Sequence, residues 1–377
     1  MHRFTRNLAF LMVFVGLVAA CSDSSSDSTA TPAPSTPVTE VSPPAPTDPP
    51  TTAPVAAIGF RKVTPGGGCE CADGSEFSFW VREADPAKVM FFFQGGGACF
   101  TAETCSFSDG NYKVTTGGGD NPEGGAGIFD FADARNPFAD YSVVFVPYCT
   151  GDVHLGNADT QYAPDLLVHH KGYINGTAAL DELATTFPNA TQVVVAGESA
   201  GSIPTPLYAG LVHDRLPDAQ ITVVADGSGA YPDLPAVNVT IGTQWGTANA
   251  IPDWPENAGL TAEQWSLPGL FVQAGKHDPA IVFARHDYAF DQTQEFFATL
   301  AGIPADRLVD LIDANETQIE ASGIDLFSYI SPGKQHTVLG GPRFYTEEQN
   351  GVPLYTWVTD LITGVPVDDV HCAVCTG

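Results

Sequence analysis

Apolar runs of strand length recur along the chain with few polar interruptions. They cover residues 88–94, 141–148, 192–197, 220–226 and 281–288. Strands buried on both faces of a parallel sheet have this composition, whereas half-exposed strands alternate apolar and polar residues. The runs therefore predict a mostly parallel sheet with both faces covered.

Segments of helical periodicity lie between and after these strands. They cover residues 176–187, 205–216, 292–302 and 354–364. Strands that alternate with helices over this length indicate an α/β fold, with a doubly wound sheet and helices on both faces. Two long loops, 111–128 and 243–268, contain Gly or Pro, and such loops often carry substrate contacts.

The first 55 residues have a different character. Residues 1–21 join basic residues to a short apolar run and end in Val18-Ala19-Ala20-Cys21, which resembles a bacterial lipoprotein signal with Cys21 as the lipidated residue. An ordinary secretory signal is the alternative. Residues 22–55 are rich in Ser, Thr and Pro and predict a disordered tether, which leaves residues 56–377 as the folded domain. We expect an exported protein, lipid-anchored to the bacterial cell envelope and facing the periplasm or the exterior.

The charge balance is strongly acidic. Fifteen basic and 44 acidic residues give a formal charge of −29. Binding to phosphates requires clustered Lys and Arg, so this balance argues against nucleic acid and anionic membrane surfaces as partners. Any membrane contact is expected through the N-terminal lipid only.

Seven cysteines follow Cys21, and an exported protein with this many is expected to form disulfides. They are Cys69, Cys71, Cys99, Cys105, Cys149, Cys372 and Cys375. An odd number leaves at least one thiol free or paired between chains. The CxxC at 372–375 lacks a thioredoxin-like context, so we interpret it as structural.

The stretch VVVAGESAGS, residues 193–202, predicts a nucleophile elbow. An apolar strand leads into Gly-x-Ser-x-Gly, and a helix follows. Gly197 and Gly201 leave room where the turn brings backbone segments together, and the helix N-terminus favours negative charge near Ser199. We therefore predict Ser199 as a catalytic nucleophile on an α/β-hydrolase-like fold. A tight turn with a small residue is the alternative.

A catalytic serine needs a base and an acid, which follow it in the order acid, then His, on this fold. His277, His286, His336 and His371 follow Ser199. His336 lies in a loop after a short strand and is the predicted base. The candidate acids are Asp226, Asp278, Asp287 and Asp291. Asp291, at a strand-to-helix junction, is preferred over Asp278, and a helix N-cap is its alternative role.

A glycine run after an early strand predicts the oxyanion hole. Residues 95–98 read Gly-Gly-Gly-Ala, like the loop that supplies backbone donors in esterases. The N–H groups of Gly96, Gly97 and Ala200 are the predicted donors. The run lacks the spacing of a phosphate-binding loop, and the predicted chemistry requires no cofactor.

Four further residues have side chains of the kinds that bind metal ions. They are Asp152, His154, His169 and His170. A zinc site needs more ligands at a defined spacing, so we predict no metal and assign these side chains to hydrogen bonds or to the pocket wall. Trp245, Trp254, Trp265 and Phe100 are candidates for lining an acyl or sugar pocket, or for the core.

Four segments together resemble the pectinacetylesterase and Notum family of α/β hydrolases. They are FQGGGACF, VPYCTGDVHLG, GESAGS and YAFDQTQ, and the likeness extends from about residue 71 to 357. The resemblance implies that Asp291 is the triad acid and that Asp226 is structural. It also implies that Cys99 pairs with Cys105, and Cys149 with Cys69 or Cys71. The tail pair would then join to each other or to the remaining cysteine.

Two departures from the family pattern bear on the site. Glu198 stands where many members have Cys, and Ala98 replaces a large aromatic residue, which should open the pocket mouth. The resulting hypothesis is a serine carboxylester hydrolase that deacetylates a polysaccharide such as pectin. One alternative is an esterase acting on longer acyl esters or polyesters. The other is a surface glycan-binding protein that has the fold but no turnover.

Overall fold

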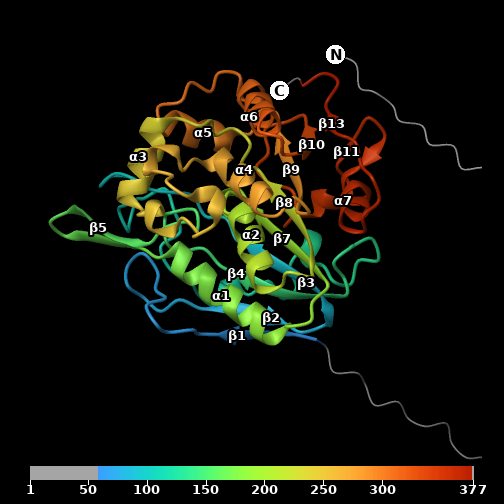
Figure 1. Cartoon of the computed structure of the whole chain (residues 1–377), viewed down its shortest axis with the longest axis horizontal. Coiled ribbons are helices and arrows are strands. Elements are labelled where there is room, and N and C mark those ends of the chain that lie inside the picture. Colours follow the sequence, from blue (N-terminus) through green and yellow to red (C-terminus); the bar gives the residue numbers. More distant parts are fainter. Residues whose placement is uncertain (1–57, 376–377) are drawn as a thin grey trace, which may run out of the picture. The chain divides into compact units, whose positions relative to one another are not determined.

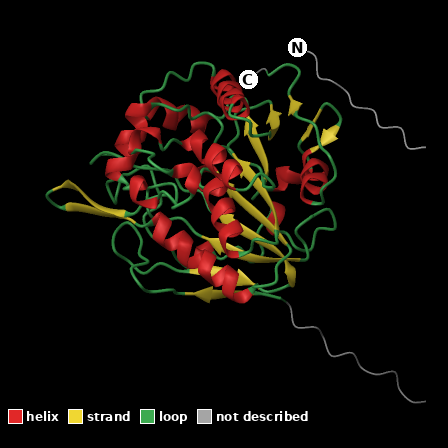
Figure 2. Ribbon diagram, in the orientation of Figure 1, coloured by secondary structure: helices red, strands yellow, loops and turns green. Residues whose placement is uncertain are grey.

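A nine-stranded sheet forms the centre of the structure, which is a computed structural model describing residues 58–375 (Figures 1 and 2). The predicted signal, its lipidation site Cys21 and the tether 22–55 lie outside the described residues. The strand order is β1 (Phe60–Val63), β2 (Phe79–Arg82), β4 (Tyr141–Val146), β3 (Asp85–Phe93), β7 (Gln192–Glu198), β8 (Gln220–Asp226), β9 (Val282–Tyr288), β10 (Leu326–Ser331) and β13 (Val370–His371).

The sheet is mostly parallel, as the sequence predicts. Only β1 with β2 and β2 with β4 pair antiparallel, and the pairs from β4 through β13 are parallel. The carboxyl ends of β3, β7, β8 and β9 therefore meet at one edge. Ligands of open α/β sheets bind outside this edge, so the loops that leave it are where a site is expected.

Helices cover both faces of the sheet, and the alternation along β3 shows why (Figure 1). Val89, Phe91 and Phe93 pack on one face, with α1 (Gly172–Thr186), α2 (Thr205–Arg215) and α4 (Leu267–His277). Met90 and Phe92 pack on the other face, with α7 (Leu354–Ile362). Because both faces are buried, the strand is apolar throughout. Within residues 58–375, none of the helices combines the length and the apolar character needed to cross a bilayer.

Three further α-helices and two hairpins lie outside the nine-stranded sheet. They are α3 (Pro235–Gln244), α5 (Gln292–Leu300), α6 (Leu308–Ala321) and the hairpins β5 (Ala158–Ala163) with β6 (Leu166–His170) and β11 (Glu348–Gln349) with β12 (Val352–Pro353). The segment 243–268, expected as a loop, contains three short 3-10 helices and is joined to α3 and α4. The β5–β6 hairpin extends away from the sheet (Figure 1).

Three disulfides tie the described residues together. Cys71 pairs with Cys149, and Cys99 pairs with Cys105. Cys372 pairs with Cys375, so the CxxC of the tail is a local staple, and Cys69 is the unpaired thiol among residues 58–375. The resemblance allowed Cys149 to pair with Cys69 or Cys71, and in the structure its partner is Cys71.

Candidate active site

Ser199 occupies a strained turn between β7 and α2. It follows the last residue of β7 directly and has a φ of 55°. A non-glycine residue rarely adopts this left-handed conformation, which persists only where the surroundings enforce it. A β-carbon on Gly201 would collide with the backbone oxygen of Phe93, and one on Gly197 would collide with Gly201. The two glycines of the pattern are thus required by close backbone packing.

His336 and Asp291 form a hydrogen-bonded pair. Nδ1 of His336 donates to Oδ2 of Asp291 over 2.7 Å, and the aspartate is fully buried at the start of α5. The other oxygen, Oδ1, accepts the backbone N–H groups of Thr293 and Gln294 at 2.9 and 3.0 Å. Asp291 is therefore both the helix N-cap and the partner of the histidine, and the two roles use different oxygens.

The surroundings favour the protonated form of His336. Burial lowers the pKa of the imidazole, but the hydrogen bond to Asp291 and the negative charges of Asp291, Asp226 and Glu198 outweigh it, so the pKa is raised. Its Nε2 is buried and has no hydrogen-bond partner in the described part of the chain. No hydrogen bond joins Nε2 to Ser199 Oγ among these residues. Catalytic hydrogen bonds are often loose in unliganded sites and tighten when substrate binds.

Asp226 holds the loop that carries His336. Its Oδ2 accepts the N–H groups of Val338 and Leu339 at 2.7 and 2.9 Å, and its Oδ1 lies 2.8 Å from Nδ1 of His286. Thr337, next to His336, has a φ of 60°. A β-branched residue in this conformation is strained, and the two bonds from Asp226 to the following amides hold the loop in place.

A buried polar network lies behind Asp291. Nε2 of Gln294 donates to Asp287 Oδ1 at 2.8 Å and lies 3.2 Å from Asp291 Oδ2. Asp287 forms an ion pair with Arg285, and Oδ2 of Asp287 lies 2.8 Å from Nε of Arg285. The sequence shows Gln294 only as part of the YAFDQTQ segment. The network was missed although its members lie within ten residues, because the turn between β9 and α5 brings them together and no periodic pattern encodes that turn.

The other histidines and aspartates considered for the triad make contacts elsewhere in the structure. Asp278 Oδ2 is 3.1 Å from Nδ1 of His213, and His277 Nε2 is 2.8 Å from Asp214 Oδ1. His371 contacts Asp313. Asp287 and His286 belong to the supports described above. Within residues 58–375, two pairs join a candidate histidine to a candidate acid by a hydrogen bond: His336 with Asp291, and His286 with Asp226. The second pair supports the loop that carries His336.

The glycine run lies next to the elbow. A β-carbon on Gly95 would lie 2.7 Å from Cβ of Ser199, so the approach requires glycine. Gly97 has a φ of 81° and bridges to Tyr112. Gly97 and Ala200 line the same cavity as Ser199, whereas Gly96 does not line it and packs against Tyr148. Ala200 lies in the first turn of a 3-10 helix, where N–H groups lack intrahelical acceptors.

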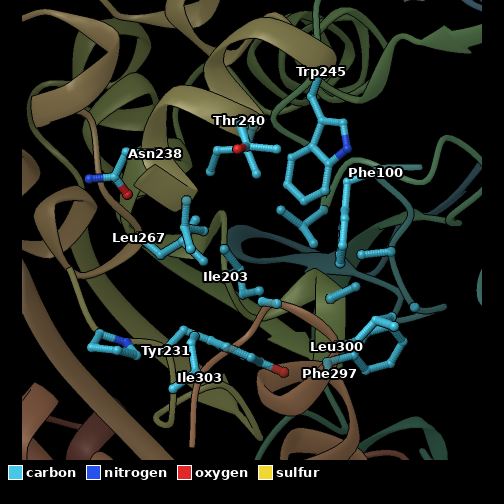
Figure 3. A pocket seen from close by; sticks show the side chains of 18 of the residues that line it. Phe100, Ile203, Tyr231, Asn238, Thr240, Trp245, Leu267, Phe297, Leu300 and Ile303 are labelled. Atoms are coloured by element: carbon cyan, nitrogen blue, oxygen red, sulfur yellow. The ribbon is translucent and has the colours of Figure 1, made fainter. Parts of the chain in front are cut away.

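An apolar cavity of about 290 Å³ opens beside Ser199. Its walls come from the glycine run, the elbow, the segment 231–245 and α5 with the residues after it. The side chains that define it are Phe100, Ile203, Ile241, Trp245, Leu267, Phe297, Leu300 and Ile303, most of which are labelled in Figure 3. Ala98 also lines the cavity. Trp254 and Trp265 do not line it and belong to the core.

The residues considered for a metal are held by protein groups. Asp152 is buried, and its oxygens accept from Thr150, His154 and Gly172. Nε2 of His154 lies 2.9 Å from the Gln94 carbonyl oxygen, and burial lowers the pKa of His154 to about 4.

The other two histidines belong to separate contacts. His170 contacts the Thr150 carbonyl and the Tyr162 hydroxyl. His169 lies near Glu70 and Asp159, a trio whose side chains could hold a cation. Lys171 Nζ is 2.8 Å from Asp159 Oδ1 and already supplies a positive charge there.

The mostly parallel sheet with helices on both faces defines an α/β-hydrolase-like protein, and the elbow at Ser199 stands where this class carries its nucleophile. The chain belongs to the pectinacetylesterase family, whose sequence model matches residues 60–252. This range includes the glycine run and Ser199, and it ends before Asp291 and His336.

Individual relatives share only part of their length with the chain. Pectin acetylesterase 4 of Arabidopsis thaliana is 25% identical over 42% of this chain and 41% of its own length. Palmitoleoyl-protein carboxylesterase notum2 of Xenopus laevis is 30% identical over 35% of this chain and 27% of its own. A Danio rerio protein named inactive palmitoleoyl-protein carboxylesterase notum1b is 29% identical over 23% and 66%. The chain thus spans less than half the length of the first two.

Proposed function

We propose that the protein is a serine carboxylester hydrolase with Ser199 as nucleophile, His336 as general base and Asp291 as the acid that orients it. The observation that carries the proposal is the strained Ser199 on the wall of a cavity, combined with a partly exposed His336 that is held by the buried Asp291. A strained serine alone is compatible with a turn. A histidine whose Nδ1 is held by a buried carboxylate, with Nε2 unpartnered, is suited to accept a proton.

The reaction proceeds in two acyl transfers. His336 Nε2 takes the proton of Ser199 as Oγ attacks the ester carbonyl, and the imidazolium then protonates the leaving alcohol. Water attacks the acyl-serine, again giving its proton to His336, which returns it to Ser199 as the acid leaves. Asp291 stabilises the imidazolium in both halves. The N–H groups of Gly97 and Ala200, with Gly96 as a third candidate, would stabilise the tetrahedral oxyanion.

The relatives' names suggest an acetylated polysaccharide such as pectin as the substrate. Export and lipid anchoring, expected from residues 1–21, would give an enzyme of the cell envelope access to such a polymer.

The cavity favours a second candidate, esters with longer acyl chains. Its volume of about 290 Å³ is larger than an acetyl group fills, and its walls are mostly apolar. Burying each further methylene is worth about 0.8 kcal/mol, so a longer chain would gain affinity here.

An assay with p-nitrophenyl acetate, butyrate and octanoate tests the proposal. We expect turnover by the wild-type protein and its loss in Ser199→Ala, with an increase in kcat/KM from acetate to butyrate or octanoate if the cavity binds the acyl chain. Wild-type protein that is folded and yet shows no turnover on any ester would support a glycan-binding role instead. One of the similar proteins, from Danio rerio, is itself named an inactive carboxylesterase.

A further inference from the structure

Glu198 is a second carboxylate beside the nucleophile, and the proposed reaction leaves it without a role. It is the last residue of β7, directly before Ser199, and it pairs in register with Asp226, the last residue of β8. Asp226 in turn pairs in register with His286 on β9. The ends of three neighbouring parallel strands thus present Glu198, Asp226 and His286 side by side. Glu198 is not among the residues lining the cavity, so it is not placed to contact an acyl chain.

The Glu198 carboxylate faces the loop that carries His336. A β-carbon on Gly340 would lie 2.9 Å from Glu198 Oε2, and the backbone of Gly340 interacts with the carboxylate. Asp226 accepts the amides of Val338 and Leu339. Three successive residues of the loop therefore rest on two carboxylates, directly after the strained Thr337. This arrangement opposes relaxation of the loop, which would move the imidazole.

Charges couple Glu198 to His336. Burial raises the pKa of Glu198 to about 7, and the negative charge of Asp226 adds to the increase, whereas His336 and the Gly340 backbone lower it. In the other direction, Glu198 is among the groups that raise the pKa of His336. The charged groups facing this imidazole come from three elements: Asp291 from the start of α5, Asp226 from the end of β8 and Glu198 from the end of β7.

We propose that Glu198 is a positioning residue for the reaction, whose carboxylate supports the His336 loop and stabilises the imidazolium formed in each acyl transfer. The inference rests on the proposed esterase function. Asp291 holds the ring through a direct hydrogen bond, and Glu198 acts on the same ring through its charge and through Gly340. From this position, one residue before Ser199, the negative charge reaches the imidazole without occupying the acyl cavity.

The sign of the effect follows from the base role of His336. The imidazole must be neutral to accept the Ser199 proton, so activity rises as the pH passes upward through the pKa of His336. The pKa of Glu198 is about 7, so its carboxylate is mostly ionised only above neutral pH. In that range, removing its charge makes the imidazolium less stable, which moves the upper part of the acid limb of the pH profile to lower pH. The same loss weakens transition-state stabilisation on the plateau. We expect kcat to fall about threefold to tenfold, with KM within about twofold.

The test compares Glu198→Gln, which keeps the size but removes the charge, with Glu316→Gln. Glu316 is a matched control because burial raises its pKa as well. Its carboxylate accepts a hydrogen bond from the Ser328 hydroxyl and is not among the groups that raise the pKa of His336. For each folded variant, kcat and KM are measured on p-nitrophenyl butyrate across pH 5–9. The rate at which a fluorophosphonate labels Ser199 is measured over the same range and requires no turnover. The proposal expects the acid limb of Glu198→Gln about half to one pH unit lower in both measurements, and that of Glu316→Gln unchanged.

Three outcomes would overturn the inference. An acid limb of Glu198→Gln that coincides with the wild type would remove the electrostatic role, and an equal change in Glu316→Gln would make the effect unspecific. If Glu198→Gln does not fold, Glu198→Asp keeps the charge on a shorter side chain. Its acid limb is expected near that of the wild type, with a reduced kcat. If the acid limb of Glu198→Asp shifted from that of the wild type while kcat stayed unchanged, the proposal would be contradicted. Failure of the esterase function itself is distinguishable, because the wild-type protein would then show neither turnover nor labelling.

Discussion

The Nδ1 of His336 lies 2.7 Å from Oδ2 of Asp291, while Oδ1 of the same carboxylate caps α5. The orientation of the imidazole is therefore fixed by a group that is itself locked to a helix N-terminus. Gln294, in the first turn of α5, contacts the same Oδ2 and extends the support to Asp287. Rigid second supports of this kind keep a catalytic side chain within the narrow geometry that proton transfer requires.

Replacing Asp291 with Asn should separate capping from catalysis. Asn keeps an oxygen for the N–H groups of α5 but cannot hold the Nδ1–H of His336 in the correct tautomer. We expect kcat to fall by about 10⁴ with little change in KM. The melting temperature should stay near the wild-type value, whereas Asp291→Ala should also lose about 1 kcal/mol of stability through the missing cap. An Asn variant with wild-type kcat would exclude Asp291 as the triad acid.

The pH dependence of kcat/KM should have its acid midpoint above 6.5, the usual value for His. Burial alone would lower the pKa of His336, but Asp291 and the neighbouring carboxylates raise it. Because the neutral imidazole is the active form, acidification through this raised pKa removes activity. Steady-state rates on p-nitrophenyl butyrate from pH 5 to 9 measure the midpoint. A midpoint below 6.5 would show that desolvation outweighs the carboxylates.

Filling the cavity next to Gly97 should change acyl preference without changing the chemistry. Ala98 lines the cavity, so Ala98→Trp should reduce its volume. We expect kcat/KM on p-nitrophenyl octanoate to fall about tenfold or more, while the value on acetate stays within about threefold. Ala98→Ser is a size-matched control. Equal losses on both esters would indicate that the acyl chain does not enter this cavity.

The disulfides Cys71–Cys149 and Cys99–Cys105 should differ in their contribution to stability. Cys71 and Cys149 are 78 residues apart, whereas Cys99 and Cys105 are six apart. In the chain-entropy model, the longer loop contributes about 4 kcal/mol and the shorter about 2 kcal/mol. Urea denaturation of the two double Ala variants measures this difference. A larger loss for the short loop would point to native-state packing rather than chain entropy as the cause.

Much of the central sheet can be predicted from the chain because its strands are buried on both faces. The strand over 220–226 has the predicted bounds, and the run at 192–197 extends by one residue to Glu198. The segment 243–268 shows the opposite case. Its 3-10 helices carry no regular apolar period and make contacts with distant parts of the chain, such as the bond from Asn249 Nδ2 to the Asn157 carbonyl.

Part of the candidate site could also be predicted from the sequence, namely the part that a local pattern encodes. The elbow is a local pattern, so Ser199 and its glycines can be found from ten residues. The pairing of His336 with Asp291 joins residues 45 positions apart, and the sequence suggests it only through chain order and family likeness. The support of the His336 loop by Asp226 and Glu198 depends on the register of neighbouring strands, and no local pattern encodes that register.

The cavity and the reacting groups are built from different parts of the chain. Ser199 sits at the end of a sheet strand, and Asp291 and His336 lie in the segments that follow two others. The greater part of the apolar wall comes from the segment 231–245 and from residues 297–303. In the proposed reaction, insertions or exchanges in that wall would therefore alter which acid is released and leave the groups that transfer the proton unchanged. In the proposed enzyme, this separation would let one grafted segment redirect ester selectivity.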